Sequence, residues 1–261
     1  MIILPEEKKE NNIYLLSGDS RFKLLEQNYI VTRKEEGRLY PDKILAQLPA
    51  INRSHQLYHE WKLREASMKS LIKYFNDNIK LEILDLGCGN CWLANQLSIK
   101  TENFVCAVDI NMGELEQGAG VFSNNNRLQF IYADIFENIL PQNSFDAVLI
   151  SSSIQYFKDL RLLIDRLLNL LNFCGEIHII DSNFYKANEL KEAMTRTEIY
   201  YNKLGHPEMI QYYHHHCWEE LDEFNYQILN KNKLRIGKVV NRVFQNNFSP
   251  FPWIRIKAKD N

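Results

Sequence analysis

The stretch from Ile83 to Trp92 restricts the fold more than any other part of the chain. An apolar run, Ile83–Leu86, leads directly into Gly87–Gly89 and then into a segment with helical spacing. A strand that passes through two glycines into a helix leaves bare backbone where a ligand can approach, with the helix N-terminus aimed at it. This order of elements predicts a nucleotide-type site at the end of a parallel strand.

The same alternation of strands and helices continues along the chain. We predict strands over 81–86, 103–110, 128–136, 145–152 and 175–181, and helices over 92–100, 114–122 and 160–172. A helix over 186–204 and a last pair of strands, 226–229 and 253–257, follow. The pattern predicts an α/β, Rossmann-like sheet of seven strands, mostly parallel, with helices on both faces and one antiparallel C-terminal strand.

The first 76 residues precede this alternation, and we expect them to form an N-terminal cap on a main domain at 77–261. Asn28–Arg33 alternates like a strand and indicates a hairpin with the stretch that follows it. Residues 56–76 have the spacing of an amphipathic helix. Tyr58 and Trp61 on this helix are core aromatics or candidates for a lid over the site, and residues 185–224 should cover the substrate.

Composition narrows the class of partner. The 261 residues are 45% hydrophobic and 25% charged, as in a globular protein, and the formal net charge is −2. Without a basic cluster there is no footprint for a nucleic-acid backbone, so a small-molecule substrate is the better expectation. The N-terminus lacks a signal-peptide pattern and no apolar run could span a bilayer, which predicts a cytoplasmic protein with no membrane span. The oligomeric state is left open.

Acidic residues follow two further predicted strands. Asp109 ends the second strand, close to the ~20-residue offset at which a carboxylate meets a ribose. Asp134 lies at the end of the third strand, beside the place where the base of such a nucleoside would lie. The carboxyl ends of parallel strands meet at one edge of the sheet, so these residues should converge with the glycine loop.

These residues together resemble the class I S-adenosylmethionine (SAM) dependent methyltransferases. The resemblance rests on the loop at Ile83–Gly89, the strand ends at Val108–Asp109 and Ala133–Asp134, and the strand at Phe145–Leu149 with the Ser151–Phe157 segment after it. The Gly175–Ile177 strand also matches. The likeness covers roughly residues 81–185. It implies that the chain transfers a methyl group from SAM, leaving S-adenosylhomocysteine (SAH).

The resemblance also implies roles for particular residues. Asp85 would orient the amino group of SAM, Asp109 would bind the ribose hydroxyls, and Asp134 would contact the adenine. Ser151 and Ser152 would lie near the methionine tail and the transferred methyl. The implied cofactor-binding residues are Asp85, Gly87, Cys88, Gly89, Asp109, Ile110, Asp134, Ile135, Ser151 and Ser152.

Two alternatives to catalysis by SAM stay open from the sequence. One is a SAM-binding or nucleotide-binding module without catalysis. The other is a nicotinamide-dependent oxidoreductase, whose fingerprint needs a glycine where this chain has Trp92. The family often has a third glycine where this chain has Cys91, which makes the loop here more crowded. No residue is identified as catalytic, and neither the acceptor nor the atom methylated is apparent.

Several other residues invite a metal or substrate assignment. Cys88 and Cys91 form a Cys-x-x-Cys pair, but no second pair completes a zinc site. Consecutive histidines at 214–216 cannot all point to one place, so no metal is expected there either. The remaining substrate-side candidates are Tyr156, Tyr185 and His214. Asp181 and Ser182 also emerge at the sheet edge, with no assigned role.

Overall fold

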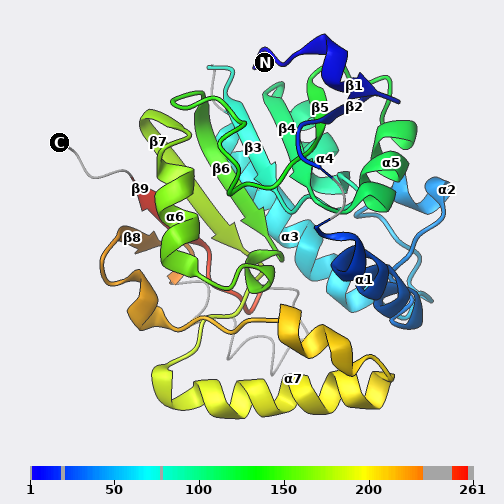
Figure 1. The fold of residues 1–261 in the computed structure, drawn as a ribbon, viewed down its shortest axis with the longest axis vertical. Helices are drawn as coiled ribbons and strands as arrows, with labels where there is room; N and C mark the ends of the chain where they lie inside the picture. The colour runs from blue at the N-terminus through cyan, green and yellow to red at the C-terminus, as the bar shows by residue number, and fades with distance from the viewer. Residues whose placement is uncertain (1, 19–20, 77–78, 232–248, 258–261) are drawn as a thin grey trace.

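A mixed sheet forms the centre of the molecule (Figure 1). The computed structural model describes residues 2–18, 21–76, 79–231 and 249–257. Within these residues the sheet has nine strands in the order β1-β2-β5-β4-β3-β6-β7-β9-β8. The strands are β1 (Lys9–Glu10), β2 (Ile13–Leu15), β3 (Glu82–Leu86), β4 (Phe104–Asp109), β5 (Leu128–Tyr132), β6 (Phe145–Ser151), β7 (Leu171–Ile180), β8 (Asn225–Ile228) and β9 (Ile254–Lys257).

Helices cover both faces of this sheet and one of its ends. The α-helices are α1 (Lys23–Glu35), α2 (Asp42–Leu45), α3 (Tyr58–Phe75), α4 (Trp92–Thr101), α5 (Met112–Val121), α6 (Leu160–Leu168) and α7 (Leu190–Leu204). Short 3-10 turns are η1 (Glu6–Lys8), η2 (Ile154–Tyr156), η3 (Ala187–Glu189), η4 (Pro207–Tyr212) and η5 (Trp218–Leu221). None of the helices in the described ranges is long and apolar enough to cross a membrane.

The alternation of side chains along each strand divides the core into two layers. Leu84 and Leu86 of β3 pack into the layer covered by α6, whereas Ile83 packs into the layer covered by α3, α4 and α5. Asp85 projects on the same side as Ile83 and, although it is a carboxylate, it is only 1% exposed. A carboxylate at that position is therefore enclosed by apolar helices on one side and by the glycine loop on the other.

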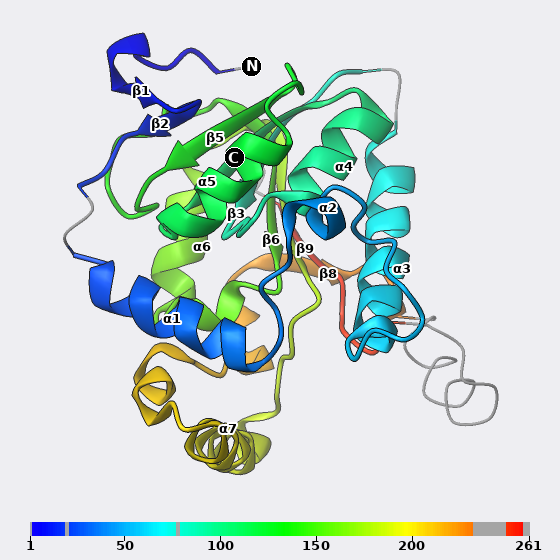
Figure 2. The same ribbon diagram turned by 90° about the vertical axis from the view of Figure 1, so that its right-hand side faces the viewer.

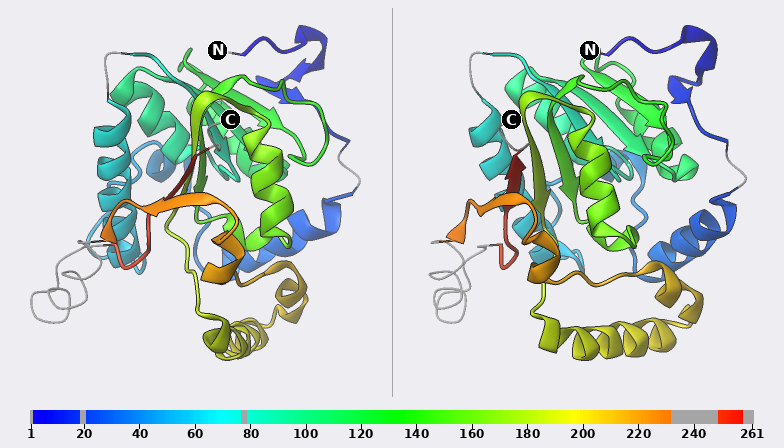
Figure 3. Two further views of the ribbon diagram at one scale, coloured as in Figure 1. Left: turned by 90° about the vertical axis from the view of Figure 1, so that its left-hand side faces the viewer. Right: turned by 60° about the vertical axis from the view of Figure 1, so that its left-hand side comes forward.

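The strand order reverses beside β3, and this reversal positions the site. β4 and β5 extend the sheet on one side of β3, while β6 and β7 extend it on the other, all with parallel pairing. Ligands of open α/β sheets bind outside the carboxyl ends of the strands at such a point. α1 and α7 lie beyond this end of the sheet in both Figure 2 and Figure 3, so they cover it.

The predicted fold class is confirmed, including the C-terminal pair: β9 runs antiparallel to both β7 and β8. The sheet nevertheless has nine strands in the described residues rather than the seven expected. The two extra strands, β1 and β2, are short and come from the N-terminal segment, where β2 pairs in parallel with β5. Strands of two and three residues carry too little periodicity to be recognised in a sequence.

The hairpin expected around Asn28–Arg33 is wrong, because this stretch lies inside the helix α1. Its β-branched residues suggest a strand, but tertiary contacts decide the outcome. Tyr29 and Arg33, one helical turn apart, both face the site, and the buried hydroxyl of Thr32 donates to the Asn28 carbonyl at 2.7 Å.

The helix expected over 160–172 ends earlier than predicted, at Leu168, because the apolar residues after it begin β7.

Candidate functional site

The glycine loop after β3 brings three chain segments together. Gly87 has φ +69°, and a side chain on it would place a Cβ 2.5 Å from the Cβ of Ser153. Its N–H donates to the Val108 carbonyl at 2.8 Å, which ties the loop to the end of β4. Glycine is required at this position by both its backbone conformation and its neighbour. The loop therefore joins the ends of β3, β4 and β6 without side chains that would occupy the crevice.

Asp109 is fixed by backbone donors at the end of β4. One carboxylate oxygen accepts from the Gly89 N–H at 2.7 Å, and the other accepts from the N–H groups of Ile110 and Asn111 at 2.7 and 2.8 Å. Burial nevertheless raises the pKa of Asp109, against the lowering effect of these three bonds. A carboxylate has about four lone-pair positions. Asp109 is therefore held rigidly and keeps about one position for a ligand.

Asp134 lies just after β5 and faces the same crevice. Its Oδ1 accepts from the Phe136 N–H at 3.0 Å, and its Oδ2 is paired with the guanidinium of Arg21. Only 8% of the Asp134 side chain is exposed, whereas Arg21 is 59% exposed. Arg21 therefore reaches from the residues before α1 across the outer side of the crevice.

Three cavities adjoin one another at this edge of the sheet. The strand-end cavity, about 450 Å³, lies between α1 and the ends of β3 to β6. The loop cavity, about 110 Å³, lies between the glycine loop, α1 and α3. The α7 cavity, about 560 Å³, lies between α7, the end of β7 and residues 213–216. Ser152, which has φ +56°, lines all three.

Two acidic side chains in the loop cavity have strongly raised pKa values. Burial, helped by the nearby charge of Asp109, raises the pKa of Asp85 to about 7. The same two causes raise the pKa of Glu114 on α5 to about 7, although Arg33 opposes them. Oδ2 of Asp85 is buried and has no hydrogen-bond partner among the described residues. A group with unsatisfied hydrogen-bonding capacity at a cavity wall is a candidate for binding a cationic ligand.

Arginines and glutamates alternate along the wall between the loop cavity and the α7 cavity. Arg33 and Arg38 pair with Glu36 at 2.5 and 3.1 Å, and Arg38 and Arg64 pair with Glu60 at 2.5 and 3.0 Å. Burial opposes ionisation of Glu60, but the two guanidiniums outweigh it and lower its pKa to about 2. Three cations against two anions leave this wall with one positive charge in excess.

The cavities contain nearly all the residues that the sequence indicated. The strand-end cavity is lined by Gly87, Gly89, Asp109, Ile110, Asp134, Ile135, Ser152 and Tyr156. The loop cavity is lined by Trp61, Asp85, Gly87, Cys88, Gly89, Ser151 and Ser152, and the α7 cavity by Ser152, Tyr185 and His214. Tyr58 is the exception. It lies at the start of α3, outside the lining of all three cavities, with the Lys62 ammonium 5.7 Å from its ring centroid.

Several site residues escaped the sequence reasoning. Tyr29 and Arg33 were hidden by the expectation of a strand, whereas as a helix they are an i, i+4 pair on one face. Glu60 and Arg64 show the same spacing on α3, and this polar pair inside an amphipathic pattern was the available signal. Glu114 gave no signal, because an acid near a helix N-terminus is common.

The histidines at 214–216 point to different partners. His215 Nε2 lies 2.9 Å from the Thr197 hydroxyl, while His216 is buried and contacts the Ile154 carbonyl at 3.2 Å and Glu220 at 3.4 Å. In the part of the chain that the structure describes, no group of three His, Cys, Asp or Glu residues could hold a metal ion. Cys88 and Cys91 are free buried thiols, with their sulfurs 3.7 Å apart.

Comparison with known proteins identifies the family to which this site belongs. The family model of a methyltransferase domain matches residues 77–240, which covers the glycine loop and the ends of β3 to β7. The chain belongs to the class I SAM-dependent methyltransferase family. The match spans the residues from which the sequence resemblance was drawn, and SAM is the cofactor of this family.

Individual relatives are distant and partial. An uncharacterized methyltransferase of Mycobacterium tuberculosis is 32% identical over 98 residues, covering 38% of this chain and 49% of the relative. The malonyl-[acyl-carrier protein] O-methyltransferase of Bacillus anthracis is 23% identical over 152 residues, covering 53% and 55%. The chain thus spans about half the length of the curated relatives it matches.

A solved structure supports the fold. Geranyl diphosphate C-methyltransferase from Streptomyces coelicolor, solved with Mg²⁺, geranyl-S-thiolodiphosphate and SAH, has a TM-score of 0.58 at 11% identity. The match covers 88% of this chain and 96% of that one. At this level of identity the likeness establishes a shared architecture, and the acceptor must be inferred from the residues of this chain.

Proposed function

We propose that this protein transfers the methyl group of SAM to a small molecule held in the α7 cavity. The observation that carries the proposal is the meeting of three cavities at Ser152. The reacting sulfur must lie where the nucleoside, the amino-acid tail and the acceptor come together. Among the residues that the structure describes, Ser152 alone lines all three spaces, and it follows β6 directly.

The strand-end cavity suits the nucleoside of SAM. Asp109 would accept a ribose hydroxyl at its remaining position, while Asp134 and Ile135 would contact the adenine. Phe22 and Leu25 of the α1 segment line the opposite side of the cavity and provide apolar surface for a planar base. Pockets of ~300–1,000 Å³ with apolar walls and a few fixed polar groups are typical of small-ligand sites.

The loop cavity suits the amino-acid tail on grounds of charge. The tail carries an ammonium and a carboxylate. Asp85, with its unsatisfied oxygen, would bind the ammonium. The wall of arginines and glutamates between the loop cavity and the α7 cavity has one positive charge in excess, and it would bind the carboxylate. Bonds between ionised partners are about twice as strong as neutral ones. The ammonium and the carboxylate of the tail would thus each meet a group of opposite charge within one small cavity.

When bound, SAM supplies a methyl group already activated by its sulfonium. The protein then has to align the acceptor and exclude water, and alignment alone can lower a barrier by ~7–11 kcal/mol. The covering helices α1 and α7 provide the enclosure. In this proposal residues 1–76 form a cap and residues 185–224 cover the substrate. α1 and α3 come from the first segment, and α7 comes from the second.

The α7 cavity argues against a module that binds SAM without catalysis, because such a module has no need for a third space of about 560 Å³ beside the sulfur.

The position of Trp92 argues against a nicotinamide dinucleotide as the cofactor. This indole occupies the first turn of α4, is buried against Trp61 with ring centroids 5.0 Å apart, and leaves no close approach for a pyrophosphate.

Binding and turnover test the proposal separately. The full chain should bind SAM and SAH in calorimetric titrations and should not bind NAD. Incubated with methyl-labelled SAM and a small-molecule fraction of a cell extract, it should transfer label to a compound that passes a size filter. Binding of NAD without binding of SAM would overturn the proposal. Binding of SAM with no transfer in any fraction would support the non-catalytic module.

A further inference from the structure

One carboxylate in the α7 cavity differs from the others in its partners. Glu36 and Glu60 are each held by two arginines. Asp181 instead accepts hydrogen bonds from two hydroxyls, those of Ser67 at 2.5 Å and Ser249 at 3.3 Å. Within residues 2–18, 21–76, 79–231 and 249–257, no cation forms an ion pair with it. Asp181 is therefore the acid of this cavity whose charge is not already neutralised.

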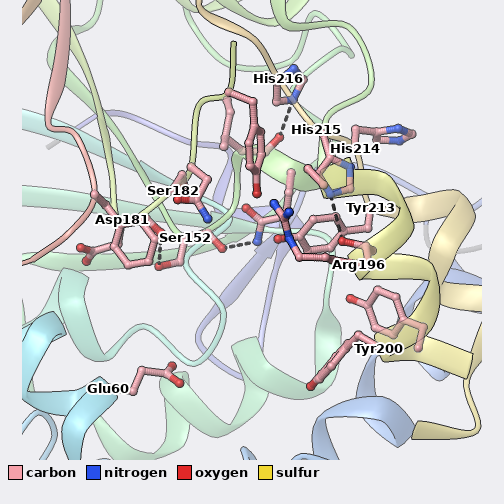
Figure 4. A pocket seen from close by; sticks show the side chains of 18 of the residues that line it. Glu60, Ser152, Asp181, Ser182, Arg196, Tyr200, Tyr213, His214, His215 and His216 are labelled. Carbon is pink, nitrogen blue, oxygen red and sulfur yellow. Dashed lines mark hydrogen bonds between the residues drawn. The ribbon is translucent and has the colours of Figure 1, made fainter. Parts of the chain in front are cut away.

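The backbone fixes Asp181 in the α7 cavity, next to Ser152, the residue that lines all three cavities. The residue follows β7 directly and has φ +52°, a left-handed conformation that non-glycine residues adopt infrequently. Its carbonyl accepts a hydrogen bond from the hydroxyl of Ser152 at 3.3 Å. Figure 4 shows the two residues side by side at one end of the cavity. Strained backbone held by its surroundings is a feature of functional sites.

The opposite part of the cavity is a wall of rings. Tyr213 lies 5.2 Å from His215 and 6.0 Å from Tyr201, and Tyr185 lies 5.6 Å from His215, all between ring centroids. Burial lowers the pKa of His215, and His216, Arg196 and His214 lower it further, which favours the neutral imidazole. Ring faces and edges of this kind favour planar ligands.

We propose that the methyl acceptor is an uncharged, ring-bearing small molecule whose O–H or N–H group faces Asp181, and that Asp181 accepts the proton of that group. The inference rests on the proposed function and names the acceptor class of the same site. The ring would lie against Tyr185, Tyr213 and His215. Asp181 would contact the substrate and is in that sense a catalytic residue.

The chemical step balances with these groups alone. The acceptor oxygen or nitrogen forms a bond to the methyl carbon while the bond from carbon to sulfur breaks, and its electron pair stays on sulfur. The proton of the O–H or N–H passes to a carboxylate oxygen of Asp181 and later to water. Burial raises the pKa of Asp181 and so makes it a better proton acceptor. A carboxylate acceptor would bring a second negative charge against Asp181.

Matched ring probes test this inference without knowledge of the natural substrate. The full chain is saturated with SAH and titrated with phenol, with anisole, which has no O–H, and with benzoate, in ligand-observed NMR. Phenol should bind about 10- to 100-fold more tightly than anisole, as expected of a hydrogen bond to a charged group. Benzoate should bind more weakly than phenol.

Asp181→Asn keeps the shape of the side chain but replaces the charged acceptor with a neutral amide, so it should reduce the preference for phenol over anisole to a few-fold at most. Asp222→Asn, an exposed aspartate outside the cavity lining, should leave the preference unchanged. SAH affinity of each variant reports whether the fold and the cofactor cavities are intact, and the comparison of the three probes on the unmodified chain needs no variant.

The outcomes separate this inference from the proposed function. Tighter binding of benzoate than of phenol, a preference for phenol that Asp181→Asn leaves undiminished, or absence of binding by phenol at millimolar concentration would each overturn the inference while SAH binding stands. Failure of SAH itself to bind would instead overturn the proposed function.

Discussion

The strand-end cavity and the α7 cavity are neighbours, but the chain builds them differently. The first is formed mainly by residues that directly follow consecutive strands, from Leu86 to Phe157, with α1 as its cover. The second combines residues as far apart as Arg33 and Phe251. Parallel topology alone brings strand ends together, whereas the second cavity depends on how α1, α3 and α7 pack. The comparison separates what topology specifies from what tertiary packing specifies.

The two sides also differ in how their charges are compensated. On the side proposed for the cofactor, Asp85 and Glu114 have pKa values of about 7 and no ion-pair partner among the described residues. On the side proposed for the acceptor, Glu36 and Glu60 are neutralised by arginines, and Asp181 is the exception. Cationic SAM can neutralise the first set. The second set suits an uncharged acceptor, and variants on the two sides should therefore affect different ligands.

The largest effect is expected from Asp109→Ala. It removes the ribose acceptor and also the anchor of the Gly89, Ile110 and Asn111 N–H groups, so SAM binding should weaken about 100-fold. Calorimetric titration measures the change. If the two sides are separable, Asp181→Asn should bind SAH as the unmodified chain does.

Asp146→Ala is the control for Asp109→Ala. Asp146 lies at the opposite edge of the sheet, where it accepts from the Glu82 N–H at 2.8 Å and from the Asn172 amide at 2.9 Å. Its loss should lower the melting temperature without a comparable change in SAM affinity. Equal losses of affinity in both variants would mean that Asp109 acts through general stability and not through the ribose.

Arg33→Met tests the boundary between the two sides, because Arg33 lines both the loop cavity and the α7 cavity. Loss of a charge-assisted bond to the carboxylate of the tail should weaken SAH binding about 10- to 50-fold. 5′-Methylthioadenosine has the nucleoside but lacks the amino-acid tail, so its affinity should stay the same. If both ligands lose affinity equally, Arg33 supports the cover helix and does not bind the tail.

The strand-end acids that the sequence indicated do line two adjoining cavities, for a physical reason. Asp85 lies in β3, Asp109 ends β4 and Asp134 follows β5, so the strands fix their positions, and a strand is recognisable from its apolar run. The lining of the α7 cavity could not be predicted in the same way. Tyr29 and Arg33 reach the site only because α1 is a helix, and burial rather than local propensity decides that this segment is helical.

The partners of Asp181 show the same limit more sharply. Ser67 comes from α3 and Ser249 from the segment before β9, and no local pattern relates either of them to the end of β7. Even so, Asp181 itself was accessible to sequence reasoning as a strand-end residue. What the sequence lacked was the information that it has hydroxyl partners while neighbouring acids have arginines.

A third prediction concerns the pH dependence of SAM binding. Asp85 and Glu114, with pKa values of about 7, are each protonated in about half of the unliganded molecules at neutral pH. A bound ammonium and sulfonium favour their ionised forms, so binding should release protons. SAM affinity should therefore increase about tenfold between roughly pH 6 and pH 8. Calorimetry in buffers of different ionisation enthalpy measures the protons released.

The free energy of unfolding of the unliganded protein should change with pH in the opposite direction to SAM affinity. Because the folded-state pKa of Asp85 lies above the ordinary value of 3.8, its contribution to the free energy of unfolding is greatest below that pH and is lost as the pH rises through about 7. SAH has no sulfonium and should show a smaller pH dependence than SAM. Glu114→Gln should flatten both profiles, and a profile that falls with rising pH would contradict the assignment.

The smallest effect is expected from Arg21→Ala, and it should have the opposite sign. Arg21 pairs with Asp134, the carboxylate proposed to contact the adenine, and must release it when SAM binds. Because Arg21 is 59% exposed, the pair stabilises the unliganded protein by less than ~1 kcal/mol, so its removal should strengthen SAM binding by up to about fivefold. Added salt should reproduce the gain in the unmodified chain by screening the pair. Arg161→Ala, which removes an exposed arginine that pairs with Glu223, should leave affinity unchanged. Weaker binding by Arg21→Ala would show instead that Arg21 belongs to the adenine site, and the strand-end cavity would then depend, like the α7 cavity, on residues that topology does not place.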